Sequence, residues 1–182
     1  MIDHQYKCVF VHQRKCAGTA VIQSFGKTLG MPDWHFGNDG ILSPEWQQIP
    51  AGYYKFSVIR NPWDRFVSGW KYCESTRHLS LVEALRHLPA EGFDYRHVTR
   101  PQADILMDGS GALVVDCLMR FETLQVDFDR VCDRLGRPRT ILARVNCGSR
   151  LGYRDYFDDD GEARRLFRER FGWDAALFGY DY

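Results

Sequence analysis

The sequence has no excess of either charge. Its 182 residues include 24 Lys and Arg and 24 Asp and Glu, which gives a formal net charge of +0 at pH 7. Proteins that bind along a nucleic-acid backbone usually carry a strong basic field. We therefore expect no nucleic-acid partner, and any anion binding should depend on a few local residues.

Long apolar runs and paired cysteines are also missing. No segment approaches the roughly 20 apolar residues of a membrane-spanning helix, and residues 1–7 contain no apolar signal region. The cysteines lack C-x-x-C or zinc-ligand spacing, which is typical of free thiols in a reducing compartment. They are Cys8, Cys16, Cys73, Cys117, Cys132 and Cys147. These absences predict a cytoplasmic protein without a transmembrane segment or a metal site, or a catalytic domain cut from a longer chain.

The hydrophobic pattern alternates between strand-like and helix-like segments. We expect strands over residues 6–11, 33–36, 53–59, 112–119 and 140–145. We expect helices over residues 18–29, 43–49, 80–88 and 124–135, with further helices that begin near residues 61 and 158. This order predicts one α/β domain over residues 1–182, with a P-loop-like three-layer architecture in which helices flank a mainly parallel sheet.

Residues 9–21, V-F-V-H-Q-R-K-C-A-G-T-A-V, indicate a phosphate-binding loop. An apolar run ends at a basic turn and an apolar helical pattern follows, so helix N–H groups and an ammonium can meet one anion. Lys15, Gly18 and Thr19 carry this chemistry. In nucleotide triphosphatases the lysine follows the last glycine and the next hydroxyl holds magnesium, whereas Lys15 precedes Gly18 by three residues. A donor that needs no metal therefore fits better.

Residues 53–70 indicate a second anion site. A β-rich run ends at Arg60, and Pro62 can begin a helix that carries Ser68 eight residues after Arg60. A planar guanidinium and a hydroxyl suit a terminal phosphate. Two phosphate sites at the carboxyl ends of two strands suggest a nucleotide with phosphates at both ends of its ribose.

These motifs resemble those of the sulfotransferases that use 3′-phosphoadenosine 5′-phosphosulfate (PAPS) as donor co-substrate, in particular the carbohydrate branch with heparan-sulfate 2-O-, chondroitin and many bacterial enzymes. Residues 120–136, 153–158 and 177–182 resemble further landmarks of that family. The resemblance implies that Arg60 and Ser68 bind the 3′-phosphate and that a loop with Ser149 closes over the donor. It implies that the first motif binds the 5′-phosphosulfate without a metal. The residues of that motif are Arg14, Lys15, Cys16, Ala17, Gly18, Thr19 and Ala20.

The first motif departs from the family pattern at four positions. Arg14 stands where the family has proline, Cys16 where it has threonine, and Ala17 where it has glycine. Ala20 replaces a serine or threonine, which removes one hydroxyl from the donor site, while Arg14 adds a charge. These changes bear on donor affinity and rate more than on the identity of the donor.

Sulfuryl transfer needs a base for the acceptor proton, and histidine has a suitable pKa. His35 is favoured, because it lies between the first helix and the Arg60 strand, where related family members carry a histidine. His97 is the alternative, because its segment Y-R-H-V-T-R-P-Q resembles a family stretch near the acceptor cleft. Lys15 is expected to neutralise charge on the leaving phosphate. Trp63 can stack on adenine or can be the first core residue of its helix.

The resulting hypothesis is a transferase that moves the sulfuryl group of PAPS to an acceptor hydroxyl on a carbohydrate or a glycosylated small molecule. Its partner is then a small molecule or a glycan, and the oligomeric state is left open. Two alternatives remain. A P-loop nucleotide kinase would depend on ATP and magnesium, and a non-catalytic nucleotide-binding relative would bind the donor without turnover.

Overall fold

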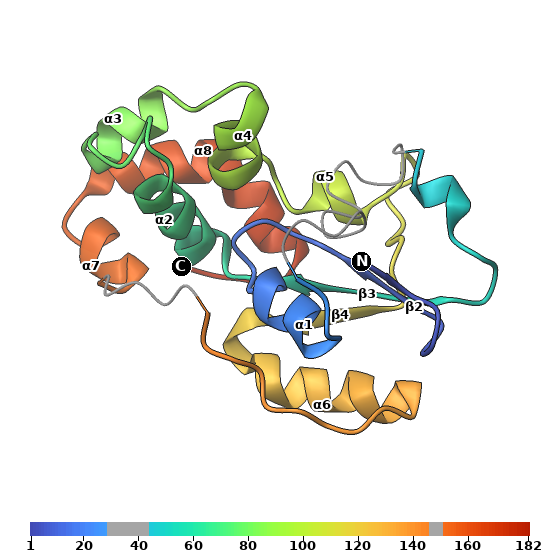
Figure 1. Ribbon diagram of the computed structural model, residues 1–182. Helices are drawn as coiled ribbons and strands as arrows, with labels where there is room; N and C mark the ends of the chain where they lie inside the picture. Colours follow the sequence, from blue (N-terminus) through green and yellow to red (C-terminus); the bar gives the residue numbers. More distant parts are fainter. Residues whose placement is uncertain (29–43, 146–150) are drawn as a thin grey trace. The chain divides into compact units, whose positions relative to one another are not determined.

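The computed structural model describes residues 1–28, 44–145 and 151–182 (Figure 1). The chain separates into two compact units, one formed by residues 1–59 and 102–147 and the other by residues 60–101 and 148–182. The strands are β1 (Ile2–Asp3), β2 (Cys8–Val11), β3 (Tyr54–Ile59) and β4 (Cys117–Arg120). The α-helices are α1 (Gly18–Ser24), α2 (Pro62–Tyr72), α3 (Leu81–Arg86), α4 (Gly92–Asp94), α5 (Ala103–Leu106), α6 (Leu124–Leu135), α7 (Tyr153–Phe157) and α8 (Gly161–Leu177). The other helical turns are η2 (Trp46–Gln48), η3 (Tyr95–Thr99) and η4 (Phe121–Thr123).

The first unit is built on a sheet whose described strands lie in the order β1-β2-β3-β4. β2, β3 and β4 run parallel, and β1 pairs antiparallel with β2 at the edge. The register pairs Phe10 with Phe56 and Val58 with Met119. All of β2 is buried, as expected for a parallel strand that is covered on both faces. The predicted α/β fold with a mainly parallel sheet is confirmed.

Helices cover this sheet on both sides. One apolar cluster joins Phe10 and Phe56 of the sheet to Ile22 of α1 and Phe128 of α6, which therefore share one face. α5 lies on the other side of the sheet (Figure 1). α6 turns a narrow apolar stripe inward and ends at Gly136, which adopts a left-handed φ of 63°. The sheet thus forms the middle layer of this unit.

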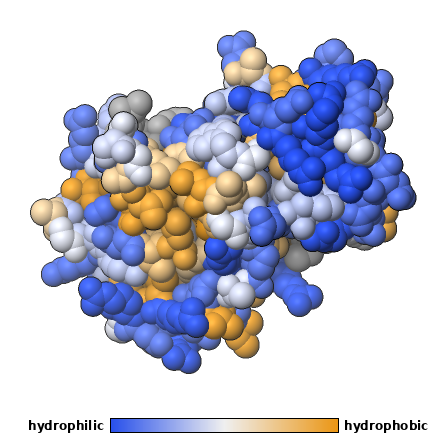
Figure 2. Space-filling model, turned by 180° about the vertical axis from the view of Figure 1, so that it is seen from behind, coloured by the Kyte–Doolittle hydropathy of each residue, from blue (hydrophilic) through white to orange (hydrophobic). Residues whose placement is uncertain are grey.

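The second unit is helical. Aromatic and aliphatic residues of α2, α3, η3, α7 and α8 meet in one apolar cluster, in which Phe66 of α2, Phe157 of α7 and Phe167 of α8 are fully or almost fully buried. The exposed side of α8 is rich in arginine and glutamate. Seen from behind in Figure 2, hydrophilic side chains cover the area of α3 and α8, at the upper right of the picture.

The helix starts that local sequence predicts are confirmed. α2 begins at Pro62, with Asn61 accepting a hydrogen bond from the next turn. Ser80 forms a capping box with Glu83 at the start of α3. Asp160 accepts a hydrogen bond from the Ala163 N–H at 2.8 Å, which explains the end of the 158–160 acidic run as a cap of α8.

Three elements of the first unit are shorter than the sequence predicts. The strand expected over residues 6–11 is β2, which begins at Cys8 and not at residue 6, because Lys7 adopts a left-handed φ of 48°. The helix expected over residues 18–29 ends at Ser24, since Gly26 has a left-handed φ of 72°. The helix expected over residues 43–49 is the single turn η2.

Two expected strands near the other edge of the sheet also differ. The strand expected over residues 112–119 starts only at Cys117, because the Asp116 carboxylate, and not a strand carbonyl, accepts the Lys55 N–H at 2.7 Å. The segment 140–145 forms no strand, because Gln125 of α6 donates to Thr140 O at 3.0 Å and ties the segment to that helix. The strand expected over residues 33–36 lies outside the described residues. The single domain over residues 1–182 stays a prediction.

Candidate functional site

The loop between β2 and α1, residues 12–17, contains two non-glycine residues in the left-handed region. They are Lys15 (φ 66°) and Ala17 (φ 57°), and this conformation costs an L-residue about 1–2 kcal/mol. The Ala17 carbonyl accepts hydrogen bonds from the N–H groups of Ala20 (3.0 Å) and Val21 (3.4 Å), so Ala17 caps α1. Because the first N–H groups of a helix have no acceptor within it, the loop ends in backbone donors and carries a lysine beside them.

Gly18, the first residue of α1, is required by its neighbour His12. A Cβ atom at Gly18 would lie within 3.0 Å of His12 Cδ2 and Nε2, closer than real Cβ atoms come to another group. The imidazole is 5% exposed and stacks on Phe10, with the ring centroids 6.0 Å apart. The glycine of the motif is therefore explained by the close packing of a buried histidine against the start of the helix.

Two buried side chains attach this loop to a segment about 90 residues further along the chain. Gln13 Nε2 donates to Gln102 O at 2.9 Å, and Cys16 Sγ lies 3.5 Å from Gln102 Oε1 and 3.5 Å from Arg14 O. Gln13 and Gln102 are 0% exposed, and Cys16 is 1% exposed. The Cys16 thiol thus points inward and Ala20 is also buried, so neither side chain is open to a ligand.

The other residues of the first motif lie nearer the surface. Arg14, Lys15, Ala17 and Thr19 are all partly exposed. The first turn of α1 contains no acidic residue. The start of α1 therefore has two basic residues and one hydroxyl nearby in the chain and no carboxylate in its first turn.

In the second unit, Arg60 is the residue that directly follows β3, and it is 7% exposed. Its Nε and Nη2 both contact Asp64 Oδ2, at 2.7 Å and 2.5 Å. Asp64 lies in the first turn of α2, where a carboxylate is favoured by the helix dipole. One edge of the guanidinium is thus held by a carboxylate four residues later, which fixes the plane of the fork.

Ser68 lies on the same face of α2 as Asp64, because residues four apart are neighbours on a helix. Its side chain is half-buried. A carboxylate and a hydroxyl therefore follow one another along one face of α2, and the Arg60 guanidinium, which precedes the helix, is bound to the carboxylate. This set contains both residues that the sequence predicts for the 3′-phosphate, together with Asp64, which the sequence analysis did not single out.

Trp63 is a core residue in this structure. The side chain is 2% exposed, and its ring stacks on Phe167 with centroids 3.8 Å apart. Phe157 and Tyr182 meet the indole edge to face at 4.8 Å and 4.7 Å. Of the two roles left open by the sequence, packing at the start of α2 is the one that this geometry supports, because stacking on adenine needs an exposed ring face.

His97 lies in η3, a π-helical turn, and is 4% exposed. Its Nδ1 lies 2.7 Å from the carbonyl oxygen of Phe93, and its ring stacks on the Phe93 ring at 3.9 Å and on the Tyr72 ring at 5.4 Å. A carbonyl can only accept, so Nδ1 carries the proton and Nε2 holds the lone pair in the neutral ring. π-Helical turns are frequent at functional sites.

α2 approaches this turn closely at Gly69. A Cβ atom there would lie within 3.0 Å of the backbone carbonyl of His97. Glycine is therefore required at this position of the helix interior, where it otherwise costs about 0.5–1 kcal/mol relative to alanine. Two other predicted site residues, His35 and Ser149, lie outside the described residues.

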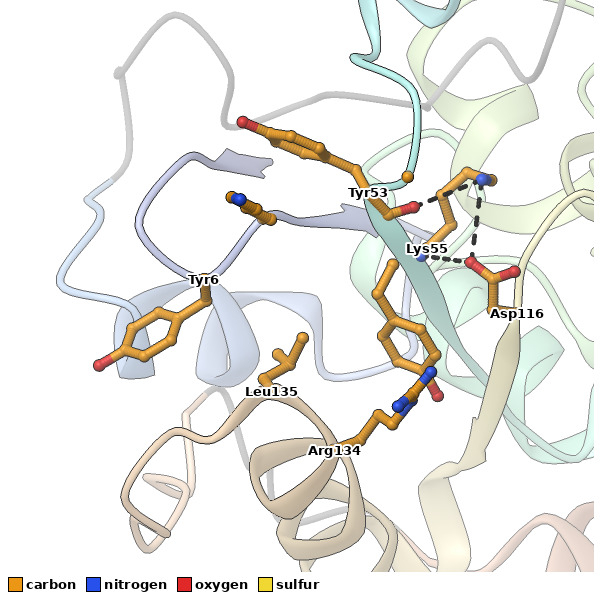
Figure 3. Close-up of a pocket in the computed structure, with 9 residues that line it drawn as sticks. Tyr6, Tyr53, Lys55, Asp116, Arg134 and Leu135 are labelled. Carbon is orange, nitrogen blue, oxygen red and sulfur yellow. Dashed lines mark hydrogen bonds and ion pairs between the residues drawn. The ribbon is translucent and has the colours of Figure 1, made fainter.

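A surface depression of about 400 Å³ lies at the end of the sheet where β2 and β3 begin, opposite to the end that is followed by the Lys15 loop (Figure 3). It is lined by residues at the starts of β2 and β3, among them Lys7, Tyr54 and Lys55, with Arg134 of α6 beside the Tyr54 ring. Burial raises the pKa of Tyr54 to about 12. Ligands of parallel α/β sheets bind at the carboxyl ends of the strands, so this depression is separate from the loop that carries Lys15.

The profile of the sulfotransferase family matches residues 1–181. The chain belongs to the sulfotransferase family. No curated protein and no solved structure gave a significant match. Membership confirms the family that the motifs indicated, and with it the class of transferase. The described part of the sulfotransferase chain contains no helix long and apolar enough to cross a bilayer, and no group of three metal-ligating side chains.

Sequence reasoning missed the residues that hold the two motifs in shape. Gln13 lies within the first motif without a predicted role, and Gln102 is the last residue of the segment Y-R-H-V-T-R-P-Q around His97. Asp64 carries a usable signal, since an acidic residue four positions after an arginine in a new helix indicates an ion pair. The contact between Gln13 and Gln102 spans 89 positions, and no spacing rule reveals it.

Proposed function

We propose that this sulfotransferase transfers the sulfuryl group of PAPS to an acceptor hydroxyl of a carbohydrate or a glycosylated small molecule. The observation that carries the proposal is the presence of two basic sites that follow two parallel strands, Lys15 in the loop after β2 and Arg60 directly after β3, in a chain of this family. PAPS bears a phosphate group on each side of its ribose. It therefore uses two separate anion sites, whereas the triphosphate of ATP uses one.

The first site suits the leaving group. As the acceptor oxygen bonds to sulfur, the bond between sulfur and the bridging oxygen breaks, and negative charge grows on the 5′-phosphate. The ammonium of Lys15 would stabilise that charge, with Thr19 and the N–H groups at the start of α1 as hydrogen-bond donors. As in phosphoryl transfer, positioning and charge stabilisation would supply most of the rate enhancement. Arg14 would add a second positive charge beside the loop.

The second site suits the 3′-phosphate. The contact with Asp64 holds the Arg60 guanidinium in one plane, and the Ser68 hydroxyl follows along the same helix face. A guanidinium in a fixed plane recognises two phosphate oxygens at once, which a flexible lysine does not. We assign the 3′-phosphate to Arg60 and Ser68 on this basis.

The base for the acceptor proton is proposed to be His35 or His97. Of the two, His97 lies within the described residues, and its contact with the Phe93 carbonyl sets the tautomer in which Nε2 can take a proton. Replacing each histidine by glutamine separates the two assignments. Loss of turnover with unchanged affinity for adenosine 3′,5′-bisphosphate identifies the base.

Calorimetric titration without added metal tests the donor. We expect adenosine 3′,5′-bisphosphate to bind wild type more tightly than adenosine diphosphate does, and Arg60→Ala to abolish that preference. Arg86→Ala is a matched control, because Arg86 forms an ion pair with Glu162 on the surface. Equal or tighter binding of the diphosphate, or a requirement for magnesium, would favour the nucleotide kinase instead.

A non-catalytic relative is the second candidate, and Ala20 is the observation that favours it. This buried alanine supplies no hydroxyl to the donor loop. Such a protein would bind the bisphosphate and the donor with the same dependence on Arg60. It would release no adenosine 3′,5′-bisphosphate from PAPS, and its properties would be indifferent to loss of either candidate histidine.

A further inference from the structure

Lys15 is flanked by two attachments to the same distant residue. Two positions before it, Gln13 Nε2 donates to the backbone carbonyl of Gln102 at 2.9 Å. One position after it, Cys16 Sγ lies 3.5 Å from Gln102 Oε1. Gln102 is fully buried and forms the N-cap of α5. The backbone of the lysine is therefore held from both sides by one fixed point.

This arrangement explains how a strained loop persists. Lys15 adopts a left-handed φ of 66°, which an L-residue maintains only where its surroundings over-determine it. Neither a glycine nor a proline stands at residues 12–17 to set the backbone. The two contacts with Gln102 supply the constraint that the loop sequence itself lacks.

Gln13 occupies its position at a cost to stability. Its side chain is 0% exposed, and its Oε1 accepts no hydrogen bond from any described residue. A buried amide oxygen without a donor destabilises the folded state, whereas an apolar side chain of the same length would fill the space without that penalty. A residue that lowers stability and fixes the shape of a ligand-binding loop is typical of a functional position.

We propose that Gln13 is a positioning residue that, through Gln102, holds Lys15 in the conformation that binds the 5′-phosphate end of the nucleotide. The proposal rests on the proposed function, because it takes Lys15 as the 5′ site and Arg60 as the 3′ site. Gln13 acts on the ligand only through the backbone of Lys15. Its loss should weaken recognition of one phosphate and spare the other.

The test is a titration series with Gln13→Met, which keeps the length of the side chain and removes both amide groups. Three probes are used: adenosine 3′,5′-bisphosphate, adenosine 3′-monophosphate and adenosine 5′-monophosphate. The affinity ratio of bisphosphate to 3′-monophosphate measures what the 5′-phosphate contributes. We expect this ratio to fall by about tenfold in Gln13→Met, the effect of losing one well-placed buried hydrogen bond. The ratio of bisphosphate to 5′-monophosphate should stay at the wild-type value.

Thermal unfolding of the same variant separates positioning from folding. Because the unpartnered oxygen is removed, we expect the Tm of Gln13→Met to equal or exceed that of wild type while 5′-phosphate recognition falls. Cys16→Ala removes the second attachment and should lower the same ratio. Gln125→Met is the matched control, since Gln125 likewise holds backbone groups of a neighbouring segment, at Thr140 and Leu142, without contacting the loop.

A wild-type 5′-phosphate ratio in Gln13→Met would overturn the proposal, and so would an equal loss in both ratios. Failure of the proposed function gives a different result, because wild type itself would then gain no affinity from one or both phosphates. A fall of the 5′ ratio in Gln125→Met would also count against the role of Gln13, since it would trace the effect to general loosening of the unit.

Discussion

Replacement of Gly18 by alanine tests the close packing at the start of α1. Alanine is the better helix former, so propensity alone predicts stabilisation of up to about 1 kcal/mol. The structure predicts the opposite, because the new Cβ would lie within 3.0 Å of two ring atoms of His12 and 3.1 Å from a third. The imidazole is 5% exposed and stacks on Phe10, so it has no solvent-filled space into which it can move.

The size of the effect follows from these opposing terms. Overpacking a buried site costs about 1–3 kcal/mol, and the gain in helix propensity offsets part of it. We expect a net loss of about 1–2 kcal/mol. For a chain of this length 1 kcal/mol corresponds to about 2–4 °C, so the Tm of Gly18→Ala should lie about 4 °C below that of wild type.

The assay is thermal unfolding of Gly18→Ala in two backgrounds, wild type and His12→Ala. With the imidazole removed, the added methyl group meets no ring, and the substitution should be neutral or slightly stabilising. This reversal of sign is the coupling that a double-mutant cycle measures. Equal destabilisation in both backgrounds would refute the reasoning, as would a Tm of Gly18→Ala at or above that of wild type.

Three further predictions concern other positions. Gly172→Ala in α8 should stabilise the protein by about 0.5–1 kcal/mol in chemical denaturation, because the atom nearest to the new Cβ would lie at 3.8 Å. Gly69→Ala in α2 should destabilise it, and the same sign for both substitutions would contradict the packing of α2 on η3. Hydrogen bonds from Ser110, chiefly from its hydroxyl, lower the pKa of Asp108, so this carboxylate stabilises the fold above its unfolded pKa near 3.8 and the contribution is lost as the pH falls below that value. In acid titrations the stabilities of wild type and Asp108→Asn should therefore converge as the pH falls below that value, and a stability difference that is constant with pH would exclude this contribution. Burial raises the pKa of the Cys8 thiol to about 12, so mass spectrometry should find Cys8 alkylated only after unfolding, and rapid labelling of the native chain would show that it is not buried.

Much of the fold follows from local sequence. The two loop motifs lie where an apolar strand pattern changes to a helical one, and the starts of α2, α3 and α8 follow from Pro62, Ser80 and Asp160. Each of these signals acts over a few residues, so it does not depend on contacts with distant parts of the chain. The parallel sheet follows from the alternation of strands and helices.

Contacts between distant segments could not be predicted. The segment 112–119 has strand composition, yet the Asp116 carboxylate bonds to Lys55 and the ladder begins one residue later. Gln125 binds the segment 140–145 to α6 by hydrogen bonds to its backbone, so the segment forms no strand, and no periodicity of the sequence reveals these contacts. Trp63 fits an apolar helix face as well as a ligand surface, and only its burial against Phe167 distinguishes the two roles.

The same limit applies to the candidate site. Lys15, Arg60 and Ser68 were found because the family motifs are contiguous in sequence. The groups that fix their geometry, Gln102 for the loop and Asp64 for the guanidinium, were not, although the ion pair of Asp64 with Arg60 has a four-residue spacing that a helix pattern can suggest.

Release of adenosine 3′,5′-bisphosphate from PAPS, in the presence of a panel of sugar hydroxyl acceptors and without divalent metal, tests the central claim most directly. The account predicts release by wild type, loss of release in Lys15→Ala, and wild-type release in Lys7→Ala, which removes the same charge at the opposite end of the sheet. Release by Lys15→Ala at the wild-type rate, or a wild-type chain that binds the bisphosphate and releases none from PAPS, would contradict it.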